Sequence, residues 1–429
     1  MSAAGPGPLA RALYRRELAP WMLSGLALGL VEGATAAVLV KRGFAGLASR
    51  DAVNLAVAFV SGAPALSNMT SFVWANLAQG REKVRLLVLL LALFGLLVGA
   101  IGLAPRASGG LAMTVLSVIA ARAVWAGVLT VRSTVWSANY PRAVLARATG
   151  RIVVLTSLGL VTAATLAGMV LEMQPRLARG LYLLAAAASL LAAWLYRRMR
   201  VRQSFRLRRA ELGEGGPAQA FSLASLRQVL REDPTYRRFM TCLAFYGAGN
   251  LMIGAQLVVI FSDQLHLPAA RQLAVLTIVP LLCIPVFTPL WARMFDAGHV
   301  IEFRARQCWA LVAAMCLMIL AIFTRQYWLM WIAAVFWGLS TAGAHLGWNL
   351  GHNDFASLGK VQQYMGVNVT LTGMRGLVAP PLGMLIYGWL ERLQAGAGRF
   401  ALLLPVAMTI AGAVGFNMMK HGRTGVHDT

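Results

Sequence analysis

Stretches of about twenty apolar residues alternate with short polar segments along the whole chain. A helix rises about 1.5 Å per residue, so twenty apolar residues cross the roughly 30 Å hydrocarbon core of a bilayer. The pattern therefore predicts an all-α polytopic membrane protein with twelve transmembrane helices, of which the sixth and ninth are short. Their expected bounds are Trp21–Val40, Val53–Leu77, Val84–Ala104, Leu111–Val131, Ile152–Leu171 and Leu181–Tyr196 in the first half, then Met240–Phe261, Leu273–Met294, Ala310–Phe323, Trp328–Leu350, Val367–Leu390 and Phe400–Met419 in the second.

A long basic segment separates the two sets of apolar runs. Residues Arg197 to Arg238 contain eleven arginines and four acids, so we expect this segment to lie in water. It divides the chain into a half at 1–196, a linker at 197–238 and a half at 239–429. Within the linker, Phe221 to Leu230 has leucines near helical spacing. That spacing is typical of an amphipathic helix on an anionic membrane surface, or of a soluble helical connector.

Composition supports a membrane protein. Hydrophobic residues make up 59% of the 429 residues and charged residues 13%, against roughly 25% charged in soluble domains. The net charge of +24 lies mostly in loops between apolar runs, which indicates membrane topology rather than nucleic-acid binding. The cysteines lie in or beside apolar runs, so we expect no disulfide framework: Cys242, Cys283, Cys308 and Cys316.

The basic residues also predict an orientation. With the N-terminus inside, the inner segments hold 26 lysines and arginines and the outer loops hold ten. Cytoplasmic loops carry the excess of Lys and Arg in membrane proteins. We therefore expect both termini and the linker in the cytoplasm, and the protein in the cytoplasmic (inner) membrane of a bacterium.

The two halves share short matches in the same order. The offsets lie between 212 and 222 residues, which indicates parallel copies of one six-helix unit. The matches include Tyr14-Arg15-Arg16 with Tyr236-Arg237-Arg238, Gly33-Ala34 with Gly254-Ala255, and Trp125 and Trp136 with Trp337 and Trp348.

This organisation resembles the major facilitator superfamily of secondary transporters. The family's motif Gly-x-x-x-Asp-Arg-x-Gly-Arg follows its second and eighth helices. Here Asp296 retains the acid in the second copy, whereas Gln79 replaces it in the first, where Arg81 and Lys83 retain basic character. The resemblance implies two pseudo-symmetric six-helix halves and a gating loop at Arg81, Lys83 and Asp296. It also implies a monomer in the lipid bilayer that handles a small molecule and protons, without nucleic acid.

In that family fold the first, fourth, seventh and tenth helices line a central cavity. Glu32 lies in the middle of the first expected helix, and Arg122 lies in the fourth. An acid in the membrane costs several kcal/mol unless it is paired or hydrated. Arg122 needs a partner because an arginine does not discharge. We predict that Glu32 takes up and releases a proton beside Arg122; a fixed structural ion pair is the alternative. Arg132, near the cytoplasmic end, is expected to snorkel towards water.

Other polar residues in these helices are candidates for substrate binding. Trp125 shares a face with Arg122, and His345 shares one with Asn349 at i and i+4. Asn250 and Gln256 could bind substrate or join helices, and His345 could instead be a packing residue. Arg375 lies in the eleventh expected helix, facing either the cavity or the boundary between the halves. The predicted substrate-binding set is Trp125, Asn250, Gln256, His345, Asn349 and Arg375.

These features predict a proton-coupled secondary active transporter of a small organic molecule, working by alternating access. Several cations against one acid in mid-membrane favour a substrate with an anionic group. An efflux pump for amphipathic compounds is the alternative transporter, and a non-transporting membrane scaffold or sensor is the alternative of another class. The sequence shows no paired carboxylates, nucleophile elbow or metal-ligand cluster, so we expect neither an enzyme nor a cofactor or metal.

Overall fold

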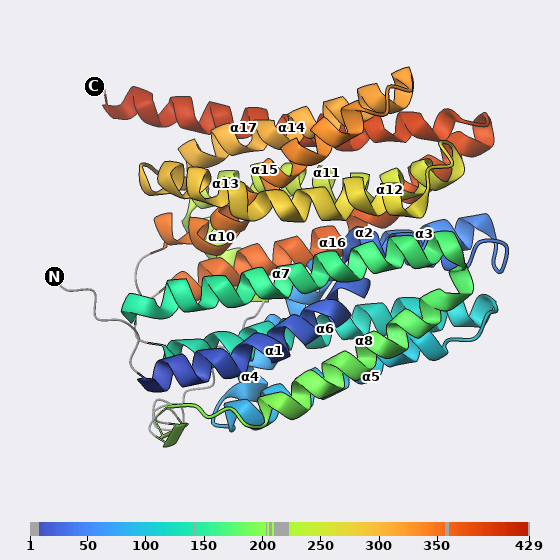
Figure 1. The fold of residues 1–429 in the computed structure, drawn as a ribbon. Helices are drawn as coiled ribbons and strands as arrows, with labels where there is room; N and C mark the ends of the chain where they lie inside the picture. Colours follow the sequence, from blue (N-terminus) through green and yellow to red (C-terminus); the bar gives the residue numbers. More distant parts are fainter. Residues whose placement is uncertain are drawn as a thin grey trace. The chain divides into compact units, whose positions relative to one another are not determined.

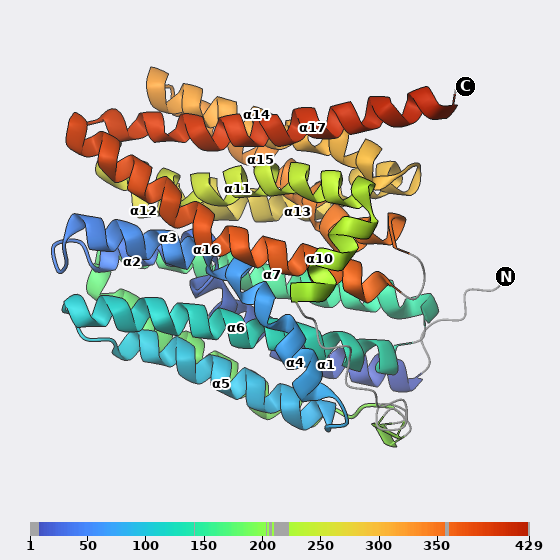
Figure 2. The ribbon, with the colours of Figure 1, turned by 180° about the vertical axis from the view of Figure 1, so that it is seen from behind.

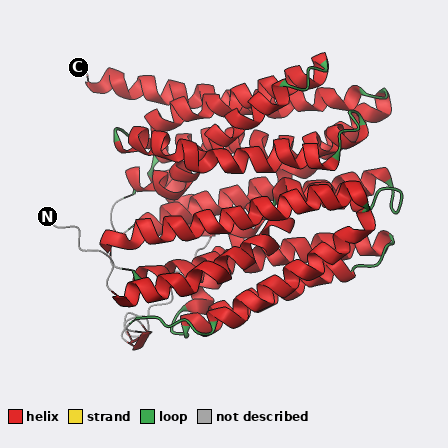
Figure 3. Ribbon diagram, viewed as in Figure 1, coloured by secondary structure: helices red, strands yellow, loops and turns green. Residues whose placement is uncertain are grey.

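The computed structural model describes residues 8–140, 142–202, 204–205, 208–209, 223–356 and 360–427. Over these ranges the chain consists of long helices joined by short turns and contains no strand (Figures 1, 2 and 3). Eleven helices are long and apolar enough to cross a membrane, and a bent pair of helices at the start of the chain makes a twelfth. The predicted all-α class with twelve spans is confirmed.

The first set of helices follows the predicted spans closely. The bent first span comprises α1 and α2, and the second comprises α3, a 3-10 turn η1 and α4. Their bounds are α1 Pro8–Leu30, α2 Gly33–Gly43, α3 Arg50–Ser67, η1 Asn68–Thr70, α4 Ser71–Ala78, α5 Lys83–Leu103, α6 Ser108–Asn139, α7 Arg142–Met173, η2 Pro175–Leu177 and α8 Ala178–Tyr196.

The second set begins with a short helix before the seventh span. A π-helical turn, η3, lies in the eighth span. The bounds are α10 Leu223–Glu232, α11 Pro234–Asp263, α12 Ala269–Leu273, η3 Ala274–Ile278, α13 Val279–Asp296, α14 Val300–Thr324, α15 Leu329–Leu350, η4 Gly351–Asp354, α16 Val361–Leu393, η5 Ala397–Leu402 and α17 Leu403–His427. The ninth span, predicted as short, is the 25-residue α14, because the helix continues through Arg304 and Arg306.

The chain forms two compact units. Unit 1 contains Met1–Ala48 and Ser67–Ala220, and unit 2 contains Ser49–Leu66 and Phe221–Thr429. Most of α3 therefore packs with unit 2, although it precedes the linker by more than a hundred residues. Its close neighbour is α16, since a Cβ on Gly62 would lie 2.2 Å from the carbonyl oxygen of Gly376. Small residues allow two membrane helices to approach to backbone contact in this way.

Charged residues at one end of α3 add to its attachment to unit 2. Arg50 donates to Asp263 at the end of α11, at 3.1 Å, and lies 3.6 Å from Glu391 of α16. Arg392 pairs with Asp51 at 2.6 Å. The Arg392–Asp51 pair is largely exposed, and an exposed ion pair contributes little. Asp263 and Glu391 are only 18% and 15% exposed, so the contacts of Arg50 are better shielded from water.

The same helix pairs recur in the two units. In unit 1, α1 packs on α7 and α8, and α5 packs on α6 and α8. In unit 2, α11 packs on α16 and α17, and α14 packs on α15 and α17. These are equivalent pairs when the six spans of each half are numbered in order. The pseudo-symmetric six-helix halves inferred from the offset matches are thus confirmed.

The start of α11 follows from its sequence, Asp-Pro-Thr-Tyr. Asp233 is the N-cap, and its Oδ1 accepts from the backbone N–H of Tyr236 at 2.8 Å. Pro234 takes the first helical position, where the missing N–H costs nothing. The Tyr364 hydroxyl donates to Asp233 Oδ2 at 3.1 Å, which joins the start of α11 to α16.

The short helix α10 packs on unit 2. Val229 is buried, and α10 contacts both α11 and α16. Glu232 accepts from Gln228 Nε2 at 2.6 Å and from Lys360 Nζ at 3.2 Å, and these bonds lower the pKa of its carboxyl. The predicted amphipathic helix is therefore present from Leu223 to Glu232, while Phe221 lies outside the described residues.

Candidate functional site

The first span is broken at Glu32. Helix α1 ends at Leu30, α2 begins at Gly33, and their axes differ by 49°. Glu32 has extended backbone, with φ −91° and ψ 124°, at the N-cap position of α2. Gly33 has φ +29°, which a residue with a side chain adopts only with strain. The break therefore places an acid at a helix N-terminus, where the partial positive charge favours a carboxylate.

Arg122 of α6 is the partner of Glu32. Its Nη1 donates to Glu32 Oε2 at 2.5 Å, and the two side chains are 10% and 30% exposed, respectively. The Nε of Arg122 is buried without a hydrogen-bond partner among the described residues. The structure thus brings together the two residues that we predicted for proton coupling. The unequal exposure makes Glu32 the more accessible member.

Gly25 and Gly29 have a packing role in α1. A Cβ on Gly25 would lie 2.4 Å from the Thr156 carbonyl oxygen of α7, and one on Gly29 would lie 2.7 Å from Ala163 Cβ. These glycines therefore let α1 approach α7, and they belong to the interior of unit 1.

Trp125, predicted to bind substrate, is in the core of unit 1. It is only 2% exposed, with its ring 5.0 Å from that of Phe94 and 6.3 Å from that of Trp21, measured between centroids. Trp21 in turn packs edge-on against Trp136 and Tyr196 at 5.8 Å. This aromatic cluster favours a packing role for Trp125 over the substrate contact that we predicted.

Sequence reasoning missed a second acid, Glu17. It lies in α1 with no exposed surface and accepts from Trp136 Nε1 at 2.6 Å and from the Tyr196 hydroxyl at 3.5 Å. We overlooked Glu17 because it precedes the expected span. One signal could have revealed Glu17. Glu17 is four residues before Trp21, and Arg132 is four residues before Trp136, so each span carries a charged residue and a tryptophan on one helix face.

We expected Arg132 to extend into water, but its side chain packs against two tryptophan rings. Its guanidinium carbon lies 4.1 Å from the ring centre of Trp136 and 4.8 Å from that of Trp21. A guanidinium over a tryptophan face is stabilised by the ring's quadrupole, more strongly where water is excluded. The aromatic cluster therefore replaces solvent for Arg132, which corrects the predicted snorkelling.

Unit 2 contains a buried polar network that the sequence did not reveal. Arg304 of α14, 2% exposed, donates through Nη1 to Gln307 Oε1 at 2.9 Å. Gln307 Nε2 donates to the Tyr246 hydroxyl at 3.2 Å and to the Ser340 carbonyl oxygen at 2.8 Å. The network joins α11, α14 and α15. The Nε of Arg304 is buried without a partner in the part of the chain that the structure describes.

Arg375 of α16 connects α16 to α11. Its Nε donates to the Leu371 carbonyl oxygen at 3.1 Å and its Nη2 to Thr372 Oγ1 at 2.6 Å, while Nη1 donates to the Leu243 carbonyl oxygen. Neither Arg375 nor Arg304 forms an ion pair with an acid of the described ranges. Among the described residues, the hydrogen-bond partners of these two arginines of unit 2 are therefore all uncharged.

Asn250 and Gln256 of α11 have different surroundings. Gln256 is fully buried and donates to the carbonyl oxygens of Gly383 at 2.9 Å and Ala401 at 3.3 Å. This geometry favours helix joining for Gln256 over the substrate contact that we predicted. Asn250 is half-buried, and its side-chain amide forms no hydrogen bond with any residue that the structure describes. It remains available to a ligand.

His345 and Asn349 lie on one exposed face of α15, as their spacing predicts. Asn349 Nδ2 donates to the carbonyl oxygen of His345 at 2.8 Å, which leaves its side-chain oxygen accessible. The imidazole of His345 has no hydrogen-bond partner within the described ranges. The exposure does not fit the packing alternative for His345, and substrate contact by His345 and Asn349 stays a prediction.

The predicted gating loop has three different environments. Lys83 is buried, and its Nζ donates to the Ala78 carbonyl oxygen at the end of α4. Arg81 is exposed after Gly80, which turns the chain with φ +67°. Asp296 is exposed at the end of α13 and pairs with no base of the described residues. Instead Asp354 accepts from the backbone N–H of Val300 at 2.6 Å, which caps α14.

The described ranges contain no group of three or more His, Cys, Asp or Glu residues that could hold a metal ion.

Comparison with known proteins identifies the family and the fold. The family model for the Major Facilitator Superfamily matches residues 18–380. No curated protein matches the sequence.

Solved structures share the fold at low sequence identity. The nucleoside transporter NupG superposes with a TM-score of 0.70 at 10% identity, covering 95% of this chain and 98% of that one. A bacterial homologue of the human lysosomal transporter Spinster, in an inward-facing occupied conformation, gives 0.67 at 13%, covering 97% and 98%. A D-xylose–proton symporter gives 0.67 at 12%, covering 95% and 97%. At these identities the likeness concerns the fold alone.

Proposed function

Because the chain belongs to the Major Facilitator Superfamily, we propose that it moves a small organic molecule across the membrane by alternating access, coupled to protons. The family membership makes the protein a secondary transporter and not an enzyme. Proton coupling and the kind of substrate are the parts that we add. The observation that carries the coupling is the Glu32–Arg122 pair at the break in the first span.

The pair can act as a proton-dependent switch. A proton that binds a carboxylate oxygen of Glu32 makes the acid neutral, while Arg122 keeps its charge. The attraction across the 2.5 Å contact then weakens, and the carboxyl group no longer favours the N-terminus of α2. Because α1 and α2 meet at Glu32, the break angle depends on this charge. A proton gradient thereby biases the two conformations of the first span.

The polar groups of unit 2 support a substrate with an anionic group. Arg375 has only neutral partners among the described residues, and the side chains of Asn250 and His345 have no hydrogen-bond partner there. Buried cations are stabilised by an opposite charge. A carboxylate or phosphate on the substrate would supply it, with hydrogen bonds from Asn250, His345 and Asn349. The D-xylose–proton symporter is an example of proton-coupled transport on this fold.

The test starts with a thermal-shift screen of metabolites on the detergent-purified protein, which identifies a substrate. Reconstituted Glu32→Gln should then still exchange that substrate across the membrane. It should lose accumulation driven by a pH gradient, because no proton can change the charge at this position. Glu172→Gln, an exposed acid at the end of α7, is the control and should accumulate substrate like the wild type.

A structural ion pair would behave differently. Loss of Glu32 would leave Arg122 unpaired, which costs roughly 3–5 kcal/mol in a buried pair and less here because Glu32 is 30% exposed. Glu32→Gln would then unfold at lower temperature, and the double variant Glu32→Gln with Arg122→Gln would recover. Full pH-driven accumulation by a well-folded Glu32→Gln protein would remove this residue from the coupling.

A further inference from the structure

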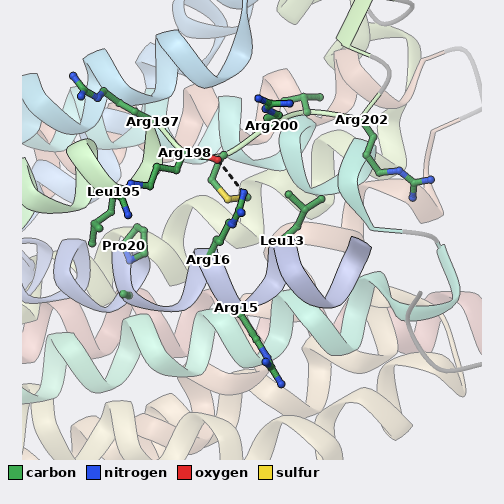
Figure 4. A pocket seen from close by; sticks show the side chains of 12 residues that line it. Leu13, Arg15, Arg16, Pro20, Leu195, Arg197, Arg198, Arg200 and Arg202 are labelled. Carbon is green, nitrogen blue, oxygen red and sulfur yellow. Dashed lines mark hydrogen bonds between the residues drawn. The ribbon is translucent and has the colours of Figure 1, made fainter. Parts of the chain in front are cut away.

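A large basic pocket lies at one end of unit 1, away from the Glu32–Arg122 pair. It has a volume of about 1000 Å³ and is lined by residues of α1 between 13 and 20 and by residues 195–202 after α8 (Figure 4). Six of the lining residues are arginines, and no acid lines it: Arg15, Arg16, Arg197, Arg198, Arg200 and Arg202. Six guanidinium groups without a counter-charge make this pocket strongly attractive to anions.

The arginines hold a defined arrangement. Figure 4 shows Arg16 pointing from α1 towards the segment after α8, where its Nη1 donates to the Arg198 carbonyl oxygen at 3.4 Å. Arg15 leaves α1 in another direction. The guanidinium carbon of Arg198 lies 4.6 Å from the ring centre of Trp194, which is 46% exposed. Arg16 therefore bridges the two walls, and Arg198 is fixed against an exposed aromatic ring.

The remaining wall is apolar. Leu13, Ala19, Pro20, Leu195 and Val201 line the pocket, and Met199 is almost fully buried beneath it. The acid of this part of α1, Glu17, is enclosed in the aromatic cluster and has no exposed surface. The pocket thus combines cationic groups with a hydrocarbon surface, which a fully hydrated inorganic anion would not use.

The position of the pocket along the helices is the second argument. The apolar span of α8 ends at Tyr196, and the first arginine follows immediately. In α1, Arg15 and Arg16 likewise stand just before the charge-free stretch 18–30, at the same end of unit 1. Exposed tryptophans next to the ends of spans are typical of the interface between hydrocarbon and headgroups. From the ends of these spans, the pocket is expected at the level of the lipid phosphates.

We propose that this pocket binds the headgroup of an anionic phospholipid. The phosphodiester would accept bidentate hydrogen bonds from Arg16 and from arginines of the 197–202 segment. The glycerol and the start of the acyl chains would contact the apolar wall and Trp194. Such a lipid would contact both α1 and the segment after α8 and so hold them together. This binding site is separate from that of the transported substrate.

The test uses the full-length protein in a non-ionic detergent. Apparent affinity and thermal stabilisation are measured with phosphatidylglycerol, with phosphatidylcholine of the same acyl chains, and with inorganic phosphate. We expect saturable stabilisation by phosphatidylglycerol and none by the other two at equal concentration. Equal stabilisation by phosphatidylcholine would overturn the charge argument, and equal stabilisation by inorganic phosphate would make the pocket a site for soluble anions.

Matched variants locate the effect. The triple variant Arg16→Gln, Arg198→Gln, Arg200→Gln should bind phosphatidylglycerol at least tenfold more weakly. The control, Arg271→Gln, Arg306→Gln, Arg325→Gln, removes the same charge from exposed positions of unit 2 outside α10 and should bind as the wild type does. An equal loss in the control would show general surface attraction and overturn the proposal. The single variant Arg16→Gln removes the bridging group with little effect on folding, and unchanged affinity in this variant would also contradict it.

Discussion

Two acids of α1 illustrate how neighbouring side chains set the role of a charged residue. Glu32 lies at a helix break, is partly exposed and faces a guanidinium. Glu17 has no exposed surface and accepts its hydrogen bonds from Trp136 and Tyr196. Glu32 is therefore an accessible acid paired with a cation, whereas Glu17 is an enclosed acid held by neutral hydrogen-bond donors. Sequence position alone does not separate them.

We predict that Glu17→Ala destabilises unit 1 by about 1–3 kcal/mol, because it leaves the buried Trp136 N–H without an acceptor. Glu17→Gln keeps an acceptor oxygen at nearly the same position and should lose less than half as much. Thermal unfolding of the purified variants in detergent, followed by tryptophan fluorescence, measures the difference. Equal midpoints for Glu17→Ala and the wild type would show that the hydrogen bond contributes nothing.

At the scale of the element, close helix contacts depend on particular glycines. In α7, a Cβ on Gly159 would lie 2.6 Å from the Met22 carbonyl oxygen of α1, whereas a Cβ on Gly150 meets nothing within 4 Å. The two positions belong to one helix and differ only in their neighbours. They therefore separate the effect of packing from that of helix propensity.

Gly159→Ala should destabilise the protein by about 1–3 kcal/mol, since α1 or α7 must move to admit the methyl group. Gly150→Ala should be neutral or stabilising by up to about 1 kcal/mol, because alanine favours the helix and meets open space. Unfolding temperatures and yields of the folded protein measure both. Similar losses at the two positions would contradict the close approach of α1 to α7.

The break between α1 and α2 and the unit assignment of α3 also belong to this scale. Hydropathy predicts one continuous first span, Trp21–Val40, because every residue around Glu32 is compatible with a helix except Gly33. The 49° bend lies at Gly33, which has a positive φ, and at Glu32, which Arg122 contacts from α6. Similarly, nothing in α3 alone indicates that Gly62 meets Gly376, more than three hundred residues later.

At the scale of the whole molecule, the charge asymmetry of the loops predicts how the protein sits in the membrane. After the four natural cysteines are replaced, single cysteines at Ser108 and Gln394 should react with an impermeant thiol reagent added to intact cells. A cysteine at Arg231, which is exposed on α10, should react only after the membrane is opened. The excess of Lys and Arg is expected inside, so labelling of position 231 in intact cells would show that the predicted orientation is wrong.

The sequence by itself determined the class of the protein, the number of its spans and its internal repeat. These properties depend on hydropathy and on the order of residues along the chain, because each span must satisfy its own backbone hydrogen bonds inside the membrane. The resemblance to the family placed the first and fourth helices, which contain Glu32 and Arg122, around one cavity, and we expected them to pair because each is costly alone.

The tertiary structure decided which polar residues are buried and which remain open to a ligand. Trp125 and Gln256 are residue types that often bind ligands. In the structure, Trp125 packs among aromatic rings, and the amide of Gln256 donates to two carbonyl oxygens. Glu17 accepts a hydrogen bond from Trp136 of α6, and Arg132 lies over the ring of Trp21 of α1, so both gained partners from helices distant in sequence. The hydrogen-bond partner of a buried polar group depends on which helices lie beside it, and hydropathy along one chain segment carries no information about those neighbours.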